Sequence, residues 1–371
     1  MKNFFVILLS VVLFAYAQNQ TIDLSLLEKS NGVYLTPKDK IPYNGKFTYT
    51  GRNIIGGPTW TQTGTLKNGK FHGECRGFRE NGRLQTIQNY KDGVLNGEEI
   101  QFYDDGITRK AVVNFLDGKQ HGRREFYSSD GKLTELHTFK NGGSDGESRK
   151  MIEGKLHIGY YKDGEKDGVW EIFNNKEVWE ISNTGNEKII ERTEYKDGKK
   201  NGKSEIFYEN GNVKQMTIYV DDKKNGKGET FYESGKPGEI GNYKDDKLDG
   251  KYERFYEDGK VAITTNYKDG KLDGKYEQFF ADGTPEIIGN YPDGKYEAFY
   301  QGGKLKLVGY NKDGKRDGKW EEFDSNGNLT QSGNFVDGRK DGVWFETSIY
   351  GETRQMRYKN GAELYYNDDD D

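Results

Sequence analysis

The stretch that decides the fold covers residues 243–290 and reads YKDDKLDGKYERFYEDGKVAITTN, then YKDGKLDGKYEQFFADGTPEIIGN. Both lines are 24 residues long and keep one pattern. Two clear copies precede them, and weaker copies cover most of the remaining chain. A unit repeated at this period predicts an array in which each copy packs on the next. The copies start at Tyr195 and Tyr219, and more weakly at Thr65, Tyr90, Phe115, Phe139, Tyr161, Tyr291, Asn311, Phe335 and Tyr358.

Each unit predicts two strands and two turns. In the copy at Tyr243, residues 251–256 are rich in strand formers, and residues 257–260 contain the Asp-Gly of a tight turn. Residues 261–267 predict the returning strand. Residues 268–274 predict a longer turn, with two glycines four positions apart.

The repeats predict an all-β protein, an elongated single-layer antiparallel meander of about twelve β-hairpin repeats that forms a solenoid. Hydrophobic residues make up 32% of the chain and aromatic residues 14%, which suits a thin sheet covered by rings better than a thick core. We expect a signal peptide over residues 1–17, a cap with the first hairpin over 18–64, and an acidic tail over 367–371. The array should occupy residues 65–366, with an irregular insertion at 174–191.

Rings recur at two positions counted from the second glycine of the longer turn. Two residues after this glycine stand Trp170, Tyr252, Tyr276, Trp320 and Trp344, and five residues after it stand Phe173, Phe207, Phe231, Phe255, Phe279 and Phe323. The two positions differ in parity, so a regular strand places them on opposite faces. Either both faces carry rings or a bulge intervenes.

The N-terminus predicts export. Lys2 precedes an apolar run over residues 4–16, and Ala15-Tyr16-Ala17 forms an A-x-A cleavage site. Cleavage is expected after Ala17. No other segment is apolar enough to cross a membrane, so we expect a secreted, periplasmic or cell-envelope protein.

The charge balance argues against nucleic-acid binding. The chain has 56 Lys and Arg against 61 Asp and Glu, for a net charge of −5. A phosphate-binding surface needs an excess of cations on one face, whereas the lysines here stand beside acids in the same turn.

No motif predicts catalysis, a cofactor or a metal. Residues 142–146 read GGSDG and match G-x-S-x-G, but they align with the longer turn of the other units, so we interpret them as a turn. His72 and His121 lie two repeats apart, roughly 20 Å at the strand spacing, too far for a shared zinc ion. His137 and His157 are expected to be exposed strand residues.

The consensus Y-x-D/N-G-x-x-D/N-G-x-W/Y-x-x-F/Y, followed by N/D-G-K-L, resembles the bacterial variant of the MORN repeat, which includes YwqK-type antitoxin-like proteins. The resemblance covers roughly residues 65–366. It implies protein–protein contact, or scaffolding and phospholipid binding as proposed for eukaryotic relatives.

These observations predict a non-enzymatic repeat scaffold that binds another protein outside the cytoplasm. An immunity or antitoxin-like protein that neutralises a toxin is the alternative. An envelope-surface structural protein that contacts glycans or lipid headgroups is a further one, although no residue pattern supports such ligands. Most rings should serve the stacking of repeats. Trp170, Trp179, Trp320 and Trp344 are the candidates for partner contact, because tryptophan on an exposed sheet often dominates binding.

Overall fold

The computed structural model describes residues 21–52, 59–174, 188–348 and 350–364. The predicted signal peptide, most of the insertion at 174–191 and the acidic tail lie outside the described residues. Contacts divide the chain into unit 1, Met1–Lys188 with Lys196–Gly198, and unit 2, Ile189–Tyr195 with Lys199–Asp371.

Unit 1 carries β1(Ile22–Asp23), η1(Leu24–Leu26), β2(Glu28–Ser30), β3(Val33–Leu35), β4(Gly45–Arg52), β5(Thr59–Lys67), β6(Lys70–Phe71), β7(Gly73–Arg79), β8(Leu84–Lys91), β9(Val94–Phe102), β10(Arg109–Leu116), β11(Lys119–Tyr127), β12(Leu133–Lys140), β13(Gly143–Ile152), β14(Lys155–Lys162) and β15(Glu165–Phe173). Unit 2 carries β16(Ile189–Lys196), β17(Lys199–Phe207), β18(Val213–Val220), β19(Lys223–Phe231), β20(Pro237–Lys244), β21(Lys247–Phe255), β22(Val261–Lys268), β23(Lys271–Phe279), β24(Pro285–Tyr291), β25(Gly294–Phe299), β26(Leu305–Lys312), β27(Lys315–Phe323), β28(Leu329–Val336), β29(Arg339–Thr347), β30(Thr353–Lys359) and β31(Ala362–Glu363).

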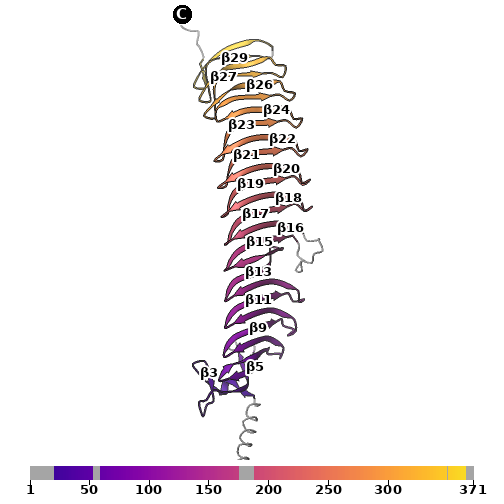
Figure 1. Cartoon of the computed structure of the whole chain (residues 1–371), viewed down its shortest axis with the longest axis vertical. Helices are drawn as coiled ribbons and strands as arrows, with labels where there is room; N and C mark the ends of the chain where they lie inside the picture. Colours follow the sequence, from indigo (N-terminus) through magenta and orange to yellow (C-terminus); the bar gives the residue numbers. More distant parts are fainter. Residues whose placement is uncertain (1–20, 53–58, 175–187, 349, 365–371) are drawn as a thin grey trace, which may run out of the picture. The chain divides into compact units, whose positions relative to one another are not determined.

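Both units are antiparallel meanders, which confirms the predicted fold class. From β7 to β15 and again from β17 to β31, each strand pairs antiparallel with the next along the chain (Figure 1). The single helical element among the described residues is the three-residue 3₁₀ turn η1. At the start of unit 1, β1 pairs parallel with β4, and a small core of Leu24, Leu27, Phe47, Leu66 and Cys75 closes the sheet.

The turn predicted over residues 268–274 is wrong in its length. Asp269 and Gly270, with φ of 52° and 82°, form a two-residue hairpin turn of the kind that matches strand twist. The second glycine, Gly274, lies inside β23 with φ of 94°, where the pairing with β22 shifts register. It therefore forms a bulge, whose positive φ glycine adopts without strain. The turn predicted over residues 142–146 is wrong for the same reason. Residues 143–146 belong to β13, and only Gly142 lies in a turn.

The tight turn predicted over residues 257–260 is confirmed. The Gly259 N–H donates to the Tyr256 carbonyl (2.8 Å), and the Tyr256 N–H donates to the Lys260 carbonyl (2.9 Å). Each repeat thus has a two-residue turn at one edge of the sheet and, at the other edge, a loop like that of residues 257–260.

At the two-residue turns, backbone hydrogen bonds join each repeat to the next. The second turn residue donates its N–H to a strand carbonyl of the preceding repeat, for example Gly270 to Leu248 (2.8 Å) and Gly338 to Arg316 (2.9 Å). Where Asp246 replaces the glycine, φ is 68° and the N–H still donates to Lys224 (3.0 Å). Its carboxylate also accepts from the Lys224 N–H (2.8 Å), so Asp adds a second bond between repeats.

At the opposite edge, a tyrosine ladder joins the repeats. The tyrosine that follows a strand donates its hydroxyl to the carbonyl of the residue that ends the same strand one repeat later. Four such bonds in unit 2 measure 2.7–2.9 Å. They run from Tyr208 to Phe231, Tyr232 to Phe255, Tyr256 to Phe279, and Tyr300 to Phe323.

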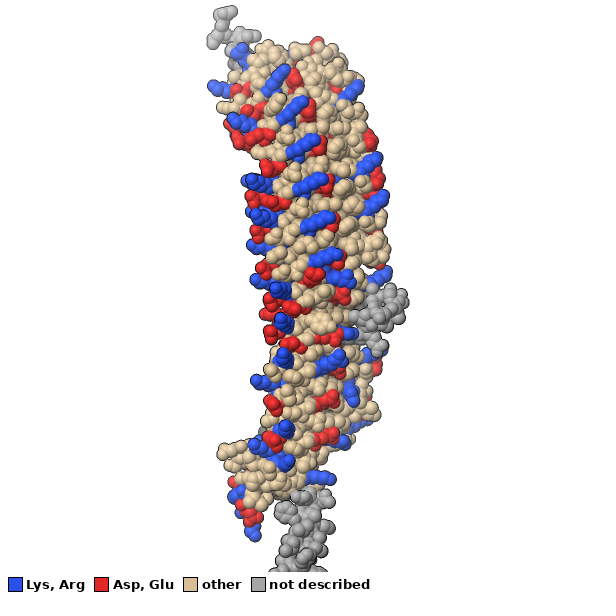
Figure 2. Space-filling model, in the orientation of Figure 1, with Lys and Arg blue, Asp and Glu red and all other residues tan. Residues whose placement is uncertain are grey.

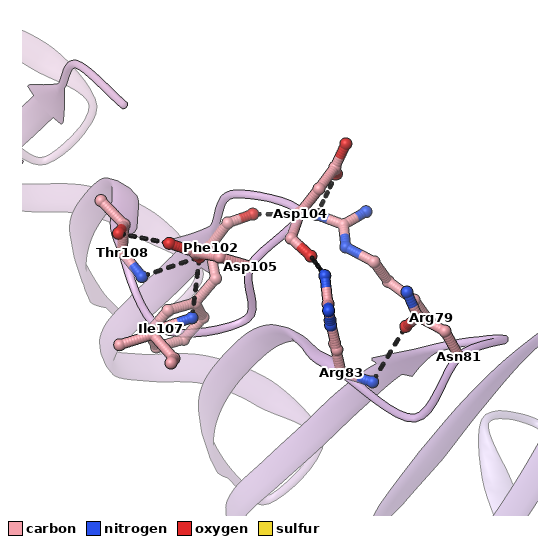
Figure 3. A network of polar contacts seen from close by, with 8 residues as sticks. All are labelled: Arg79, Asn81, Arg83, Phe102, Asp104, Asp105, Ile107 and Thr108. Carbon is pink, nitrogen blue, oxygen red and sulfur yellow. Dashed lines mark hydrogen bonds and ion pairs between the residues drawn. The ribbon is translucent and has the colours of Figure 1, made fainter. Parts of the chain in front are cut away.

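In unit 1 an arginine takes the place of one ladder tyrosine. Arg79 Nη2 donates to the Phe102 carbonyl (2.9 Å) and lies 3.2 Å from the Asp104 carboxylate. Arg83 extends the network by donating to the Asp104 carbonyl (3.1 Å), and Asp105 caps the same loop through the Thr108 backbone (Figure 3). The bond between repeats is therefore kept, although its donor changes from a hydroxyl to a guanidinium.

We expect Tyr256→Phe to lower the free energy of unfolding by about 1 kcal/mol, because it removes the hydroxyl that satisfies the Phe279 carbonyl. Urea unfolding followed by circular dichroism measures this. Tyr310→Phe, at a ring that is 57% exposed, is the matched control and should change stability less. Equal urea midpoints for the two variants would contradict a stabilising ladder.

Candidate functional site

The two faces of the sheet differ in chemistry. One face, the ring face, carries the rings two residues after the bulge glycine, such as Tyr252. The other, the Lys–Glu face, carries a lysine and a glutamate two residues apart in six repeats of unit 2. Six such pairs in unit 2 have Nζ to carboxylate distances of 2.5–2.7 Å, and Figure 2 shows cations interleaved with carboxylates over this unit. The pairs are Lys203–Glu205, Lys227–Glu229, Lys251–Glu253, Lys275–Glu277, Lys295–Glu297 and Lys319–Glu321.

The phenylalanines five residues after the bulge glycine lie on the Lys–Glu face. Arg192 lies 3.8 Å from Glu205 and stacks over the Phe207 ring at 5.9 Å, so all three side chains share that face. The strand is regular between the two ring positions, because the bulges fall at the glycine and in the neighbouring strand. The sequence left two alternatives open, and the structure shows rings on both faces of the sheet.

Three of the four predicted partner-contact tryptophans are buried on the ring face. Trp170, Trp320 and Trp344 are 7%, 3% and 2% exposed, and each donates its Nε1–H to a backbone carbonyl at 3.0–3.1 Å. Trp320 and Trp344 belong to one cluster with Phe335 between them, at ring distances of 6.0 and 5.0 Å. Trp170 lies in unit 1, and Trp179 lies outside the described residues.

Each buried tryptophan lies between a glycine and a cation. Gly309 on the neighbouring strand faces Trp320 so closely that a Cβ at this glycine would overlap the indole ring. On the other side, the Arg316 guanidinium covers the ring at 4.4 Å, and Lys340 covers Trp344 at 4.2 Å. A partner on this face would therefore meet the cations rather than the rings. The predicted role of the tryptophans in partner contact stays a prediction.

One polar network interrupts the ring face of unit 1, and it corrects the expectation that His137 is exposed. The His137 side chain is 14% exposed. Its Nδ1 lies 3.0 Å from Ser148 Oγ, and its Nε2 lies 3.0 Å from the Glu135 carboxylate. Arg124 and Lys150 lie 3.6 and 3.7 Å from the same carboxylate. Sequence reasoning missed this network, because residues on different strands meet only once the register is known.

The network has the order of a Ser–His–acid relay, but its geometry does not suit catalysis. Ser148 is 3% exposed, so its hydroxyl is not offered to a substrate. Burial lowers the pKa of His137, with Arg124 and Lys150 lowering it further, while Glu135 opposes them. Within the described ranges, no three His, Cys, Asp or Glu side chains are placed to hold a metal ion. The same residues contain no helix of the length and apolarity that crossing a membrane requires.

Two hollows open on the ring face of unit 2. The larger has a volume of about 570 Å³ and lies over β23 to β27, and the smaller, about 280 Å³, lies over β17 to β21. Both follow one row of residues that pair directly across neighbouring strands, here called the cross-strand row. Directly paired residues point to the same face, so the row places both hollows on one surface. The row contains Gln215, Thr230, Glu239, Arg254, Ile263, Gln278, Ile287, Ala298, Leu307 and Glu322.

Side-chain length explains the positions of the hollows. Four residues after the bulge glycine, the row carries the long side chains of Arg254 and Gln278 in two repeats. The equivalent residues are Thr230 in the smaller hollow and Ala298 in the larger one. Aligning the repeats by their glycines could have revealed this signal in the sequence.

Two further departures from the repeat coincide at the larger hollow. Its repeat lacks part of the bulge segment, so β25 has 6 residues where β23 and β27 have 9. The ladder tyrosine is replaced by Phe280, which has no hydroxyl to donate and lines the hollow. The short side chain of Ala298, the short strand β25 and Phe280 are thus three departures from the repeat at one hollow. Their coincidence distinguishes this site from random variation along the array.

The larger hollow is lined by rings and by charges of both signs. Phe280, Tyr296 and Tyr300 supply rings. Lys306 and Arg316 are held over the Tyr300 and Trp320 rings, at 5.4 and 4.4 Å. Glu286 accepts a hydrogen bond from Gln278 (2.7 Å). Glu322 forms no ion pair within the described residues, unlike the glutamates of the Lys–Glu face. The lining residues are Phe280, Glu286, Ile287, Tyr296, Ala298, Phe299, Tyr300, Gln301, Lys306, Leu307, Arg316 and Glu322.

Comparison with known families agrees with this architecture. Six segments match the profile of the family described as a MORN repeat variant, at residues 71–92, 120–141, 200–221, 224–245, 248–269 and 316–337. Each segment spans a strand with the bulge glycine at or near its start, the loop that follows it and the returning strand, and ends at the first residue of the next two-residue turn. These six segments, about a third of the chain, are therefore similar to the MORN repeat variant. No curated protein matches the chain.

We expect Gly309→Ala to cost about 1–3 kcal/mol of stability, because the added Cβ must displace the Trp320 ring. Gly289→Ala is the matched control, since its Cβ would meet the smaller Tyr296 ring at 3.3 Å. Urea unfolding followed by tryptophan fluorescence measures both variants. A loss for Gly309→Ala no larger than that for Gly289→Ala would contradict the ring-on-glycine contact.

We expect the stability of the chain to fall as the pH drops through 6.5, the ordinary pKa of histidine. Because the pKa of His137 is lowered in the folded state, the unfolded chain binds more protons between that lowered value and 6.5. Urea midpoints measured from pH 8 to pH 5 give this slope, and His137→Gln should flatten it. The control His121→Gln, at a hairpin end, should leave it unchanged. An unflattened slope in His137→Gln would show that other groups carry the pH dependence.

Proposed function

We propose that this chain is an exported, non-enzymatic scaffold that binds another protein through the ring face of unit 2. The observation that carries the proposal is the pair of hollows in one cross-strand row. Both are lined by tyrosine rings together with charged side chains of both signs, and the larger one also by Phe280. Aromatic side chains with charged groups at their rim are the composition that protein–protein contacts favour.

The chemistry of the remaining surface agrees with this assignment. The Lys–Glu face neutralises its own charges pair by pair, so it offers no net field to a polyanion such as nucleic acid. The net charge of −5 points in the same direction. The ring face differs, because Glu322 forms no ion pair there within the described part of the chain. A partner that brings a cation would therefore gain an interaction at this face that the Lys–Glu face does not offer.

Export is a second part of the proposal. It rests on Lys2, the apolar run over residues 4–16 and the A-x-A pattern that ends at Ala17, all outside the described residues. The protein would then meet its partner in the periplasm, in the cell envelope or outside the cell. An immunity role against a toxin is the alternative, suggested by the resemblance to YwqK-type proteins, and an envelope-surface role with a glycan or lipid ligand is the lower one.

Site-specific photo-crosslinking of the full chain in its native cells tests the partner class and the face together. We expect p-benzoylphenylalanine at position 280, which lines the larger hollow, to give an ultraviolet-dependent adduct with one dominant protein. The same probe at position 345, where Phe345 is 44% exposed on the Lys–Glu face, is the matched control and should give none.

The outcomes separate the alternatives. Equal adducts from both positions would argue against the ring face, and an adduct with glycan or lipid would replace the protein-partner proposal with the envelope alternative. If the captured protein stops growth when it is produced without this chain, the immunity role gains support.

A further inference from the structure

We propose that the ring face of unit 2 binds one extended peptide segment, which crosses the strands and places two anchoring side chains, eight or nine residues apart, in the two hollows. This inference rests on the proposed function and makes it specific. It names an unfolded or loop segment of the partner as the ligand, with a defined spacing and defined chemistry at each anchor.

The spacing follows from the sheet. The centres of the hollows are marked by Thr230 on β19 and Ala298 on β25, and the cross-strand row connects them without a break. Six strand spacings of about 4.8 Å place these residues about 29 Å apart. An extended chain advances about 3.3–3.6 Å per residue, so eight or nine residues cover that distance.

The larger hollow suits an aromatic side chain next to a basic one. A volume of about 570 Å³ holds a complete phenylalanine, tyrosine or tryptophan side chain, and Tyr296, Ile287 and Leu307 supply apolar walls. Glu322 stands at the same hollow without an ion pair within the described residues. A lysine or arginine beside the aromatic anchor would neutralise this carboxylate.

The smaller hollow suits an aliphatic side chain. Its volume is about 280 Å³, and Gly238 and Thr230 keep it open where other repeats carry longer residues. The rings of Tyr208 and Tyr232 line it. Valine, leucine or isoleucine fits such a site better than a charged residue, because burying an unpaired charge against rings is costly.

Between the hollows, the cross-strand row offers a hydrogen-bond donor to the segment's backbone. Arg254 lines the smaller hollow, and its guanidinium forms no hydrogen bond or ion pair within the described residues. The backbone carbonyls of a peptide that crosses Arg254 can accept hydrogen bonds from this guanidinium. An extended chain exposes a carbonyl at every residue, whereas a helix has already used its own.

The chain itself supplies substitutions that close each hollow and should keep the fold. Ala298→Gln introduces the residue found at the equivalent position 278, and Thr230→Arg introduces the residue found at 254. Both side chains are tolerated there in neighbouring repeats. Ser332→Gln is the matched control, because it makes a similar enlargement on the Lys–Glu face.

Selection from a phage-displayed library of random 16-residue peptides, on the immobilised chain of residues 18–371, tests the inference. We expect enriched peptides to share an aromatic residue with a basic neighbour and an aliphatic residue eight or nine positions away. A synthetic peptide of this kind, measured by fluorescence polarisation, should bind Ala298→Gln and Thr230→Arg at least tenfold more weakly and Ser332→Gln within twofold of the unchanged chain. Circular dichroism spectra of the variants should match that of the unchanged chain.

An empty selection, peptides without the spacing, or unchanged affinity in both hollow-closing variants would overturn the inference. Its failure is distinguishable from failure of the proposed function. If crosslinking from position 280 still yields a protein adduct that survives Ala298→Gln, the protein-binding role holds and the extended-segment inference falls. If neither crosslinking nor selection gives a protein ligand, both fall.

Discussion

Each repeat of this protein depends on hydrogen bonds with its neighbours, because a single-layer sheet has no second layer against which to bury side chains. The bonds are found at both edges. Turn N–H groups such as that of Gly270 donate to the preceding repeat, and ladder hydroxyls such as that of Tyr256 donate to the following one. These contacts take the place of a core, and they fix the register in which all other side chains meet.

The rings are packed by the same constraint. A ring on an open sheet can be buried only by its cross-strand neighbours, so a large ring needs a residue of almost no volume beside it. Trp320 lies against Gly309 and under Arg316, whereas the smaller Tyr252 ring packs edge-on against Tyr267 at 5.8 Å. Where a small residue has no large side chain beside it to fill the space, as at Ala298, a hollow remains on the sheet. The hollows that we assign to binding are thus gaps in an otherwise self-filling surface.

The sequence predicted the strands and turns because their signals are local, as in the Asp-Gly of residues 258–259. It failed where the outcome depends on the neighbouring strand. Gly274 looks like a turn residue in isolation, but pairing with β22 makes it a bulge inside a strand. The contact of His137 with Ser148 required the register. The hollows that we propose for binding were not predicted, because a short side chain such as Ala298 leaves a cavity only beside longer neighbours.

The tyrosine ladder has a direction, and this bears on how such a chain evolves. Each hydroxyl reaches forward by 23 residues, so each repeat that keeps this tyrosine presents the same acceptor to the repeat behind it and the same donor to the repeat ahead. An in-frame duplication or loss of one repeat in the gene rejoins an equivalent donor to an equivalent acceptor. Unequal crossing-over can therefore lengthen or shorten the protein without leaving a polar group unpaired. Such a change between β19 and β25 would also move the two hollows apart or together by one repeat, which gives the lineage a simple route to partners of different length.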